Sequence, residues 1–128
     1  MVLVRDPDQS LRFYREAFGA HVIHDSTVNG FRYLHVSIGT GGLWLIAADE
    51  RSADSVGRQT AGHPLGVVYV SDVEATMGQA VRAGATIAKE LVEDATARYA
   101  HVRDISGNEI VLVQLREAPE GQRSYAEI

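Results

Sequence analysis

The sequence contains no cysteine. This absence excludes disulfide bonds, thiolate metal sites and a cysteine nucleophile. Runs of lysine or arginine are also missing. The chain has 12 basic and 17 acidic residues, and its net charge of -5 and pI near 5.4 argue against a surface that binds phosphates. We therefore expect no nucleic-acid partner.

Long apolar stretches are missing as well. No segment approaches the roughly 20 consecutive apolar residues of a membrane span, and no signal peptide precedes the first predicted strand. We therefore expect no membrane contact and a cytoplasmic location. The chain does have 128 residues, of which 45% are apolar. This is about the length and composition of one domain with a buried core, so we predict a single domain over residues 1–128.

A repeated phrase organises this domain. Residues 31–47 and 97–113 both contain Arg-Tyr-x-His-Val followed by a glycine. An offset of 66 places residues of the first copy on identical residues of the second: Val4 on Val70, Asp6 on Asp72, Tyr33 on Tyr99, His35 on His101 and Gly41 on Gly107. Similarity at a fixed period indicates two copies of one structural unit.

Each copy shows the same order of local patterns. A short β-branched run ends at an aspartate, Asp6 or Asp72, which is suited to cap a helix that stops at Gly19 or Gly84. Three strands follow each helix, at about 21–27, 31–38 and 42–48 in the first copy and at about 86–92, 97–103 and 109–115 in the second. The sequence therefore predicts an α+β fold of tandem βαβββ units.

The boundaries follow from this pattern. The first unit covers about residues 1–48 and the second about 64–115. Between them, residues 49–63 are polar and contain glycine, so we interpret them as a linker that folds over a site. Residues 116–128 form a polar tail without an apolar period.

The doubled unit, the stretch "VRDPDQSLRFYREAFG" and the late hairpin "VRDISGNEIVLVQ" resemble the vicinal oxygen chelate superfamily over residues 1 to 115. That superfamily includes glyoxalase I, extradiol dioxygenases, fosfomycin-resistance enzymes and bleomycin-resistance proteins. The resemblance implies two curved sheets that face each other as a cup, with helices outside and the site in the cup. It leaves the function open, because one fold hosts enzymes and binding proteins alike.

In the superfamily members that use a metal, four side chains from the strands bind it. The resemblance maps these positions onto Leu45, Leu65, Val111 and a position before Met1. None of these side chains can donate a lone pair to a cation, so we predict no metal and no cofactor. A shift of two residues would bring His63 into the position of Leu65, but one histidine makes no metal site.

The repeated phrase supplies the candidate ligand-binding residues. Because side chains alternate across a strand, the resemblance directs one set into the cup: Tyr33, His35, Leu45, Leu65, Tyr99, His101 and Val111. Any single His or Tyr of this set can equally be an amphipathic filler. Trp44 has the opposite parity and is therefore expected in the core. Glu109, as a charged residue, is expected on a solvated face.

Three functions remain open at this stage. The first is a metal-free protein, similar to the bleomycin-resistance branch, that holds a small and possibly cationic organic ligand in the cup; in that branch a homodimer completes the crevice. The second is an isomerase, lyase or dioxygenase-like enzyme in which His35 or His101 transfers protons. The third is a metal held away from the family positions by the same two histidines.

Overall fold

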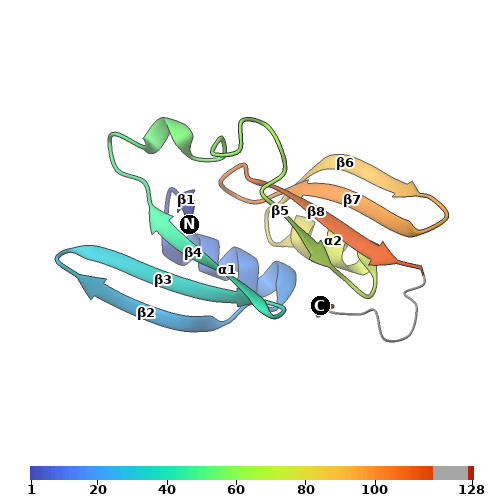
Figure 1. The fold of residues 1–128 in the computed structure, drawn as a ribbon, viewed down its shortest axis with the longest axis horizontal. Coiled ribbons are helices and arrows are strands. Elements are labelled where there is room, and N and C mark those ends of the chain that lie inside the picture. The colour runs from blue at the N-terminus through green and yellow to red at the C-terminus, as the bar shows by residue number, and fades with distance from the viewer. Residues whose placement is uncertain (117–126) are drawn as a thin grey trace.

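The computed structural model describes residues 1–116 and 127–128 and confirms the tandem βαβββ order (Figure 1). The first unit consists of β1 (Val2–Val4), α1 (Pro7–Phe18), β2 (Val22–Val28), β3 (Phe31–Ile38) and β4 (Gly41–Ala47). The second consists of β5 (Gly66–Tyr69), α2 (Val73–Arg82), β6 (Thr86–Glu93), β7 (Ala97–Arg103) and β8 (Glu109–Leu115). Neither helix is long and apolar enough to cross a membrane, within the part of the chain that the structure describes.

Each unit forms its own four-stranded sheet. The strand order is β1-β4-β3-β2 in the first sheet and β5-β8-β7-β6 in the second. In both, the first strand runs parallel to the last strand of its unit, and the remaining neighbours are antiparallel. The helix and the two strands that follow it together form the long connection between the parallel strands of each unit. We call these sheets sheet 1 and sheet 2.

The helix boundaries follow the predicted caps. The Asp6 side chain accepts hydrogen bonds from the backbone N–H groups of Asp8 and Gln9, and Pro7 occupies the first helical turn. Gly19 ends α1 in the left-handed region with φ 69°. In the second unit the Asp72 side chain accepts from Ala75 N, so both aspartates cap helices as predicted.

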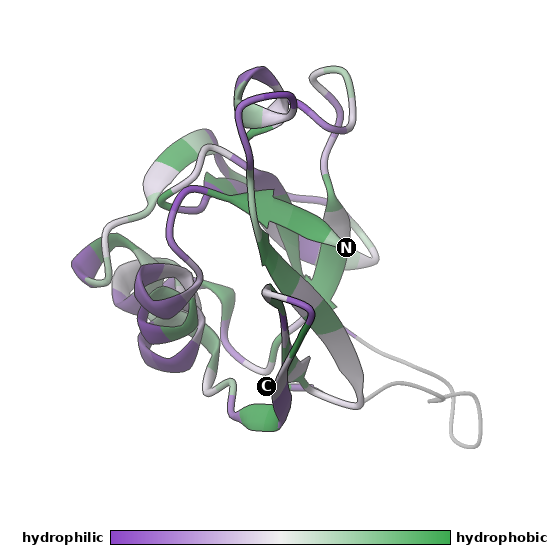
Figure 2. Ribbon diagram, turned by 90° about the vertical axis from the view of Figure 1, so that its left-hand side faces the viewer, coloured by the Kyte–Doolittle hydropathy of each residue, from purple (hydrophilic) through white to green (hydrophobic). Residues whose placement is uncertain are grey.

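One hydrophobic core joins the two units. It contains the helix faces of α1 and α2 together with the inward residues of both sheets, so Phe13 and Leu34 belong to the same cluster as Val73 and Leu112. The helices pack against each other and lie on one side of the molecule (Figure 2). In α2, Thr76 is buried, whereas Val81 is 47% exposed.

The linker is ordered and runs along the edge of the first sheet. It includes a short 3₁₀ helix, Ala53–Ser55. The Gln59 side chain accepts a hydrogen bond from Leu3 N at 2.7 Å, which satisfies an outward backbone group of β1. Gly57 adopts φ +74° and lies against the backbone of Ser106, in the loop before β8. The linker therefore touches both units.

Most of the polar tail lies outside the described residues. Its end contributes to the fold, because Ile128 N donates to Tyr69 O and Ile128 O accepts from Ser71 N, both at 3.0 Å. The Ile128 side chain packs against the hydrophobic core. This last residue therefore lies beside the end of β5.

The hairpin between β3 and β4 is one residue shorter than its counterpart between β7 and β8. In the first unit Ser37 pairs with Gly42, whereas in the second Arg103 pairs with Glu109. The offset of 66 that relates Ser37 to Arg103 therefore changes to 67 across the turn. Residues of β4 and β8 that face the same side of their sheets are therefore 67 positions apart, not 66.

Candidate functional site

Each sheet has one face covered by helices and one face turned away from them, which we call the outer face. In β3, Leu34 and Val36 are completely buried on the helix side. Tyr33 and His35 alternate with them and project from the outer face. The same alternation in β7 buries Ala100 and Val102 and leaves Tyr99 and His101 on the outer face of sheet 2.

Four rings lie together on the outer face of sheet 1. The ring of Phe31 is 4.8 Å from that of Tyr33, Tyr33 is 5.7 Å from Trp44, and Trp44 is 5.9 Å from His35, all between centroids. We call Phe31, Tyr33, His35 and Trp44 the ring cluster. Its members remain accessible, since Phe31 is 42% and Trp44 39% exposed. A flat aromatic molecule can stack on such a surface.

The predicted positions of Trp44 and Leu45 are wrong, because the shorter hairpin shifts β4 by one residue. Trp44 pairs with His35 and lies on the outer face. Leu45 pairs with Leu34 and is completely buried in the core. Trp44 is therefore the structural counterpart of Val111, which pairs with His101, and Leu45 contacts no ligand on this face.

The outer face of sheet 2 carries two rings together with charged side chains. The rings of Tyr99 and His101 are 6.3 Å apart, and Val111 lies beside His101 on β8. The ammonium of Lys89 lies 5.8 Å from the centroid of the Tyr99 ring, within the range of a cation–π contact. The two sheets therefore offer different chemistry at positions that the repeat makes equivalent.

Glu109 belongs to this second group, so the expectation that it is solvated is wrong. Its carboxylate Oε2 lies 2.8 Å from Nδ1 of His101, and its side chain is only 18% exposed. Its other oxygen, Oε1, is 3.5 Å from the guanidinium of Arg103. Sequence reasoning missed the pair because the seven residues between His101 and Glu109 include a turn whose length no pattern specified.

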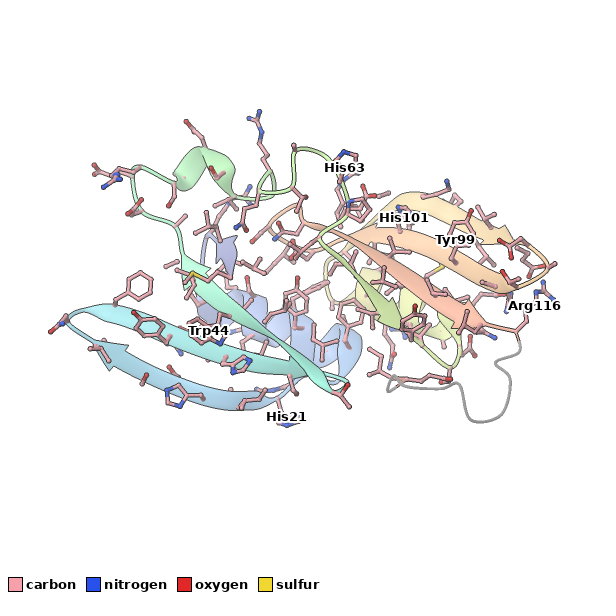
Figure 3. The ribbon with its side chains drawn as sticks, in the orientation of Figure 1. His21, Trp44, His63, Tyr99, His101 and Arg116 are labelled. Carbon is pink, nitrogen blue, oxygen red and sulfur yellow. The ribbon has the colours of Figure 1, made fainter. Side chains whose placement is uncertain are left out.

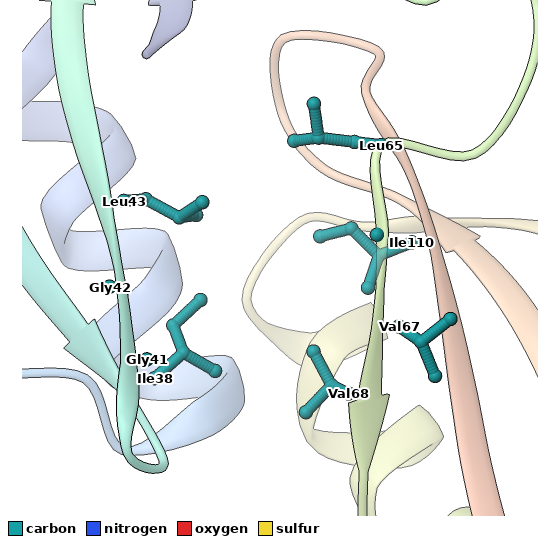
Figure 4. A pocket seen from close by; sticks show the side chains of 9 residues that line it. Ile38, Gly41, Gly42, Leu43, Leu65, Val67, Val68 and Ile110 are labelled. Carbon is teal, nitrogen blue, oxygen red and sulfur yellow. The ribbon is translucent and has the colours of Figure 1, made fainter.

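A pocket of about 200 Å³ opens between β4 and β5 (Figure 4). Leu43 and Ile38 form one wall, and Leu65, Val68 and Ile110 form the other. Val67 and three glycines, Gly41, Gly42 and Gly66, complete its lining. Of the predicted ligand-binding residues only Leu65 lines this pocket. The pocket is apolar because it opens onto the margin of the shared core.

The four repeated side chains do not surround this pocket. Tyr33 and His35 lie with Trp44 on sheet 1, whereas Tyr99 and His101 lie on sheet 2 (Figure 3). The structure therefore brings each His–Tyr pair together within its own unit. The third function considered above, a metal shared by His35 and His101, has no support in this arrangement.

The residues at the family's metal positions do not fit a metal. Leu65, Val111 and the corrected counterpart Trp44 carry no group that binds a divalent cation. His63 lies in the linker, before β5 begins, and is exposed. Within residues 1–116 and 127–128, no three or more His, Asp or Glu side chains come together as a metal site would require.

The sequence model of the Glyoxalase/Bleomycin resistance protein/Dioxygenase superfamily matches residues 1–112. With the tandem units already described, this match shows that the chain belongs to that superfamily, which is consistent with the vicinal oxygen chelate fold. No curated protein matches the chain.

Solved structures share the fold. UcmS2 is 27% identical, with a TM-score of 0.72 over 88% of this chain and 92% of that protein. TnmS3, an antibiotic binding protein from Streptomyces sp. CB03234, is 23% identical, with a TM-score of 0.62 over 89% of this chain and 90% of that protein. FosX, a fosfomycin resistance protein from Listeria monocytogenes in complex with Mn(II), is 14% identical, with a TM-score of 0.67 over 87% and 82%.

Proposed function

We propose that this protein binds a small organic molecule without a metal, and that the ring cluster is the main contact surface for the ligand. The observation that carries the proposal is the contact of three aromatic rings and one imidazole on an exposed sheet face. Removal of such exposed aromatic surface from water contributes favourably to the free energy of ligand binding. The antibiotic-binding role of TnmS3 supports the same class of function.

The ligand that fits this surface contains a flat aromatic part. A cationic group would add to the affinity, because a cation is attracted to the faces of Trp and Tyr and the chain carries a net charge of -5. The rest of the site comes from the outer face of sheet 2, with Tyr99, His101 and Val111, and from Leu65 beside the pocket. We expect the protein to act in the cytoplasm.

We infer that a second copy of the chain completes the site. In one chain Trp44 lies on sheet 1 and His101 on sheet 2 (Figure 3). Large apolar side chains stay exposed on both outer faces, including Val28 and Phe31 on sheet 1 and Val67 on sheet 2. In a homodimer, sheet 1 of one chain would face sheet 2 of the other and form a cup.

The experiment uses Trp44, the only tryptophan of the chain, as an intrinsic reporter. Its emission is measured during titration with cationic aromatic antibiotics and neutral aromatic metabolites, with elemental analysis of the protein in parallel. We expect saturable quenching by at least one compound and no stoichiometric metal. Light scattering should give twice the mass of the chain.

Trp44→Ala is the test variant, because it removes an exposed side chain from the ring cluster. Val81→Ala is its control, because it removes an exposed side chain from α2. Calorimetry should show loss of binding only for Trp44→Ala. Equal effects of the two substitutions, or a stoichiometric metal in the purified protein, would disprove the proposal.

One observation favours the alternative function, an enzyme of the same superfamily. The carboxylate of Glu109 beside His101 is an arrangement that orients a histidine for proton transfer. In such an enzyme His101, rather than His35, would be the general base. Conversion of a bound compound, followed by mass spectrometry of the mixture, distinguishes this alternative from binding alone.

A further inference from the structure

The repeat places two histidines in equivalent positions with different neighbours. His101 has the carboxylate of Glu109 at 2.8 Å from its Nδ1, and the two side chains are only 19% and 18% exposed. Its other nitrogen, Nε2, has no hydrogen-bond partner among residues 1–116 and 127–128. One side of this ring is therefore fixed by the protein and the other is available to a ligand.

Among the residues that the structure describes, His35 has no comparable hydrogen-bond partner. The position that corresponds to Glu109 is occupied by Gly42, because Ser37 pairs with Gly42 as Arg103 pairs with Glu109. The His35 ring lies over this glycine, so closely that a Cβ atom there would come within 2.4 Å of Nε2. Its ring contact is with Trp44. His35 is therefore held by packing, whereas His101 is held by a hydrogen bond.

The chemistry of the pair decides which nitrogen of His101 carries the proton. A carboxylate only accepts hydrogen bonds, so a bond between Glu109 and Nδ1 requires a proton on Nδ1. In a neutral imidazole the remaining nitrogen, Nε2, then has a free lone pair and accepts. The other carboxylate oxygen of Glu109, Oε1, lies 3.5 Å from the guanidinium of Arg103.

We propose that Glu109 is a positioning residue that fixes His101 as the Nδ1–H tautomer, and that Nε2 accepts a hydrogen bond from a hydroxyl group on an aromatic ligand. The ligand class is therefore a phenol, since the Tyr99 ring beside His101 offers a surface for the ring that carries the hydroxyl. This inference rests on the proposed function for its ligand, but the tautomer is a property of the protein alone.

Nitrogen-15 NMR of histidine-labelled protein tests the tautomer without any ligand. Spectra are recorded along an alkaline pH series until the imidazole signals stop changing, so that the tautomer is assigned for the neutral rings. We expect His101 to show a protonated Nδ1 and an unprotonated Nε2. A wild-type spectrum with the proton of His101 on Nε2 would overturn the proposal by itself.

Glu109→Gln provides the comparison, because an amide can either donate to or accept from Nδ1 and no longer dictates the tautomer. We expect the Nδ1–H form of His101 to lose its predominance in this variant. The signals of His35, in the other sheet, should not move, and they report that the fold is intact. An unchanged tautomer of His101 in a folded Glu109→Gln variant also overturns the role of Glu109.

The ligand class is tested with umbelliferone and its methyl ether 7-methoxycoumarin. The ether carries a methyl group in place of the hydroxyl hydrogen and therefore cannot donate a hydrogen bond. Fluorescence titration should show that wild type prefers umbelliferone by about tenfold, the worth of one hydrogen bond of about 1.4 kcal/mol. The preference should fall below about threefold in Glu109→Gln. If wild type does not bind umbelliferone more tightly than its ether, the phenol assignment is wrong.

The two tests separate this inference from the proposed function. Quenching of Trp44 by umbelliferone and its methyl ether with equal affinity, together with the Nδ1–H tautomer, would uphold binding and the role of Glu109 and overturn only the phenol. Quenching with the proton of His101 on Nε2 would uphold the proposed function and overturn the inference.

Discussion

The hydroxyl of Tyr14 donates a hydrogen bond of 2.5 Å to Oδ2 of Asp104, and this bond joins α1 of the first unit to the loop before β8 in the second. Both side chains are buried. Asp104 also accepts from the backbone N–H groups of Ser106 and Asn108 and from the Asn108 amide. The offset of 66 places Ala80 opposite Tyr14 in the repeat, so the symmetry of the units does not supply this bond twice.

Replacement of Tyr14 by phenylalanine should destabilise the protein by about 1–3 kcal/mol, because it removes a donor from a buried carboxylate. Urea unfolding followed by circular dichroism measures the change. Tyr33→Phe is the control, since the Tyr33 hydroxyl has no hydrogen-bond partner among residues 1–116 and 127–128. Equal stability of the two variants would contradict the role assigned to the Tyr14–Asp104 bond.

The same phenol predicts how stability depends on alkaline pH. Burial raises the pKa of Tyr14 well above the ordinary value of about 10, and the nearby Asp104 carboxylate adds to the increase. The protonated Tyr14 phenol contributes fully to stability below about pH 10, the ordinary pKa of the unfolded chain. As the pH rises toward the higher pKa of the folded state, the unfolded chain releases the proton while the folded chain keeps it, so the free energy of unfolding falls.

Urea midpoints between about pH 9 and about pH 11 measure this effect. Wild type should lose more stability over this range than Tyr14→Phe, in which the titrating phenol is absent. The other tyrosines are common to both proteins and cancel in the comparison. Parallel pH curves for the two proteins would argue against a raised pKa in the folded state.

The contact between the linker and the second unit is tested at Gly57. A Cβ atom there would come within 2.4 Å of Ser106 O, and the residue has φ +74°. Gly62 also has a positive φ, +86°, but a Cβ atom there meets nothing within 4 Å. Both alanine variants incur the cost of about 1 kcal/mol for the left-handed conformation. Thermal unfolding should show a further loss only for Gly57→Ala.

The register of β4 is tested by comparing Leu45→Ala with Trp44→Ala. The core position predicts a loss of about 2–5 kcal/mol for Leu45→Ala. Trp44→Ala should cost less, although it removes the larger side chain, because Trp44 is 39% exposed. Chemical denaturation followed by circular dichroism measures both, since the second variant has no tryptophan signal. A larger loss for Trp44→Ala than for Leu45→Ala would contradict this register and support the sequence prediction that Trp44 lies in the core.

The fold could be predicted from the sequence because its determinants are local or repeated. Asp6 and Gly19 mark the ends of α1 through backbone groups within a few residues, and the identical phrases around His35 and His101 reveal the two units. Local patterns could not identify Asp104 as the partner of Tyr14, because that bond spans 90 residues and breaks the symmetry of the repeat.

The candidate site was harder to predict because a side chain's face depends on the length of the preceding turn. Gly41 and Gly107 align in the sequence, yet the pairing of β3 with β4 is one residue shorter than that of β7 with β8. This single residue moved Trp44 onto the outer face and Leu45 into the core. No sequence pattern specifies the length of this turn, so Trp44 could not be assigned to the outer face.

In evolutionary terms, the short turn between β3 and β4 shows how little is needed to diversify a duplicated gene. Loss or gain of one codon in a turn exchanges the two faces of the strand that follows, because side chains alternate with a period of two. In β4 such an event trades a buried leucine for a tryptophan without any substitution in either codon. One unit can therefore present a contact surface that its twin does not have.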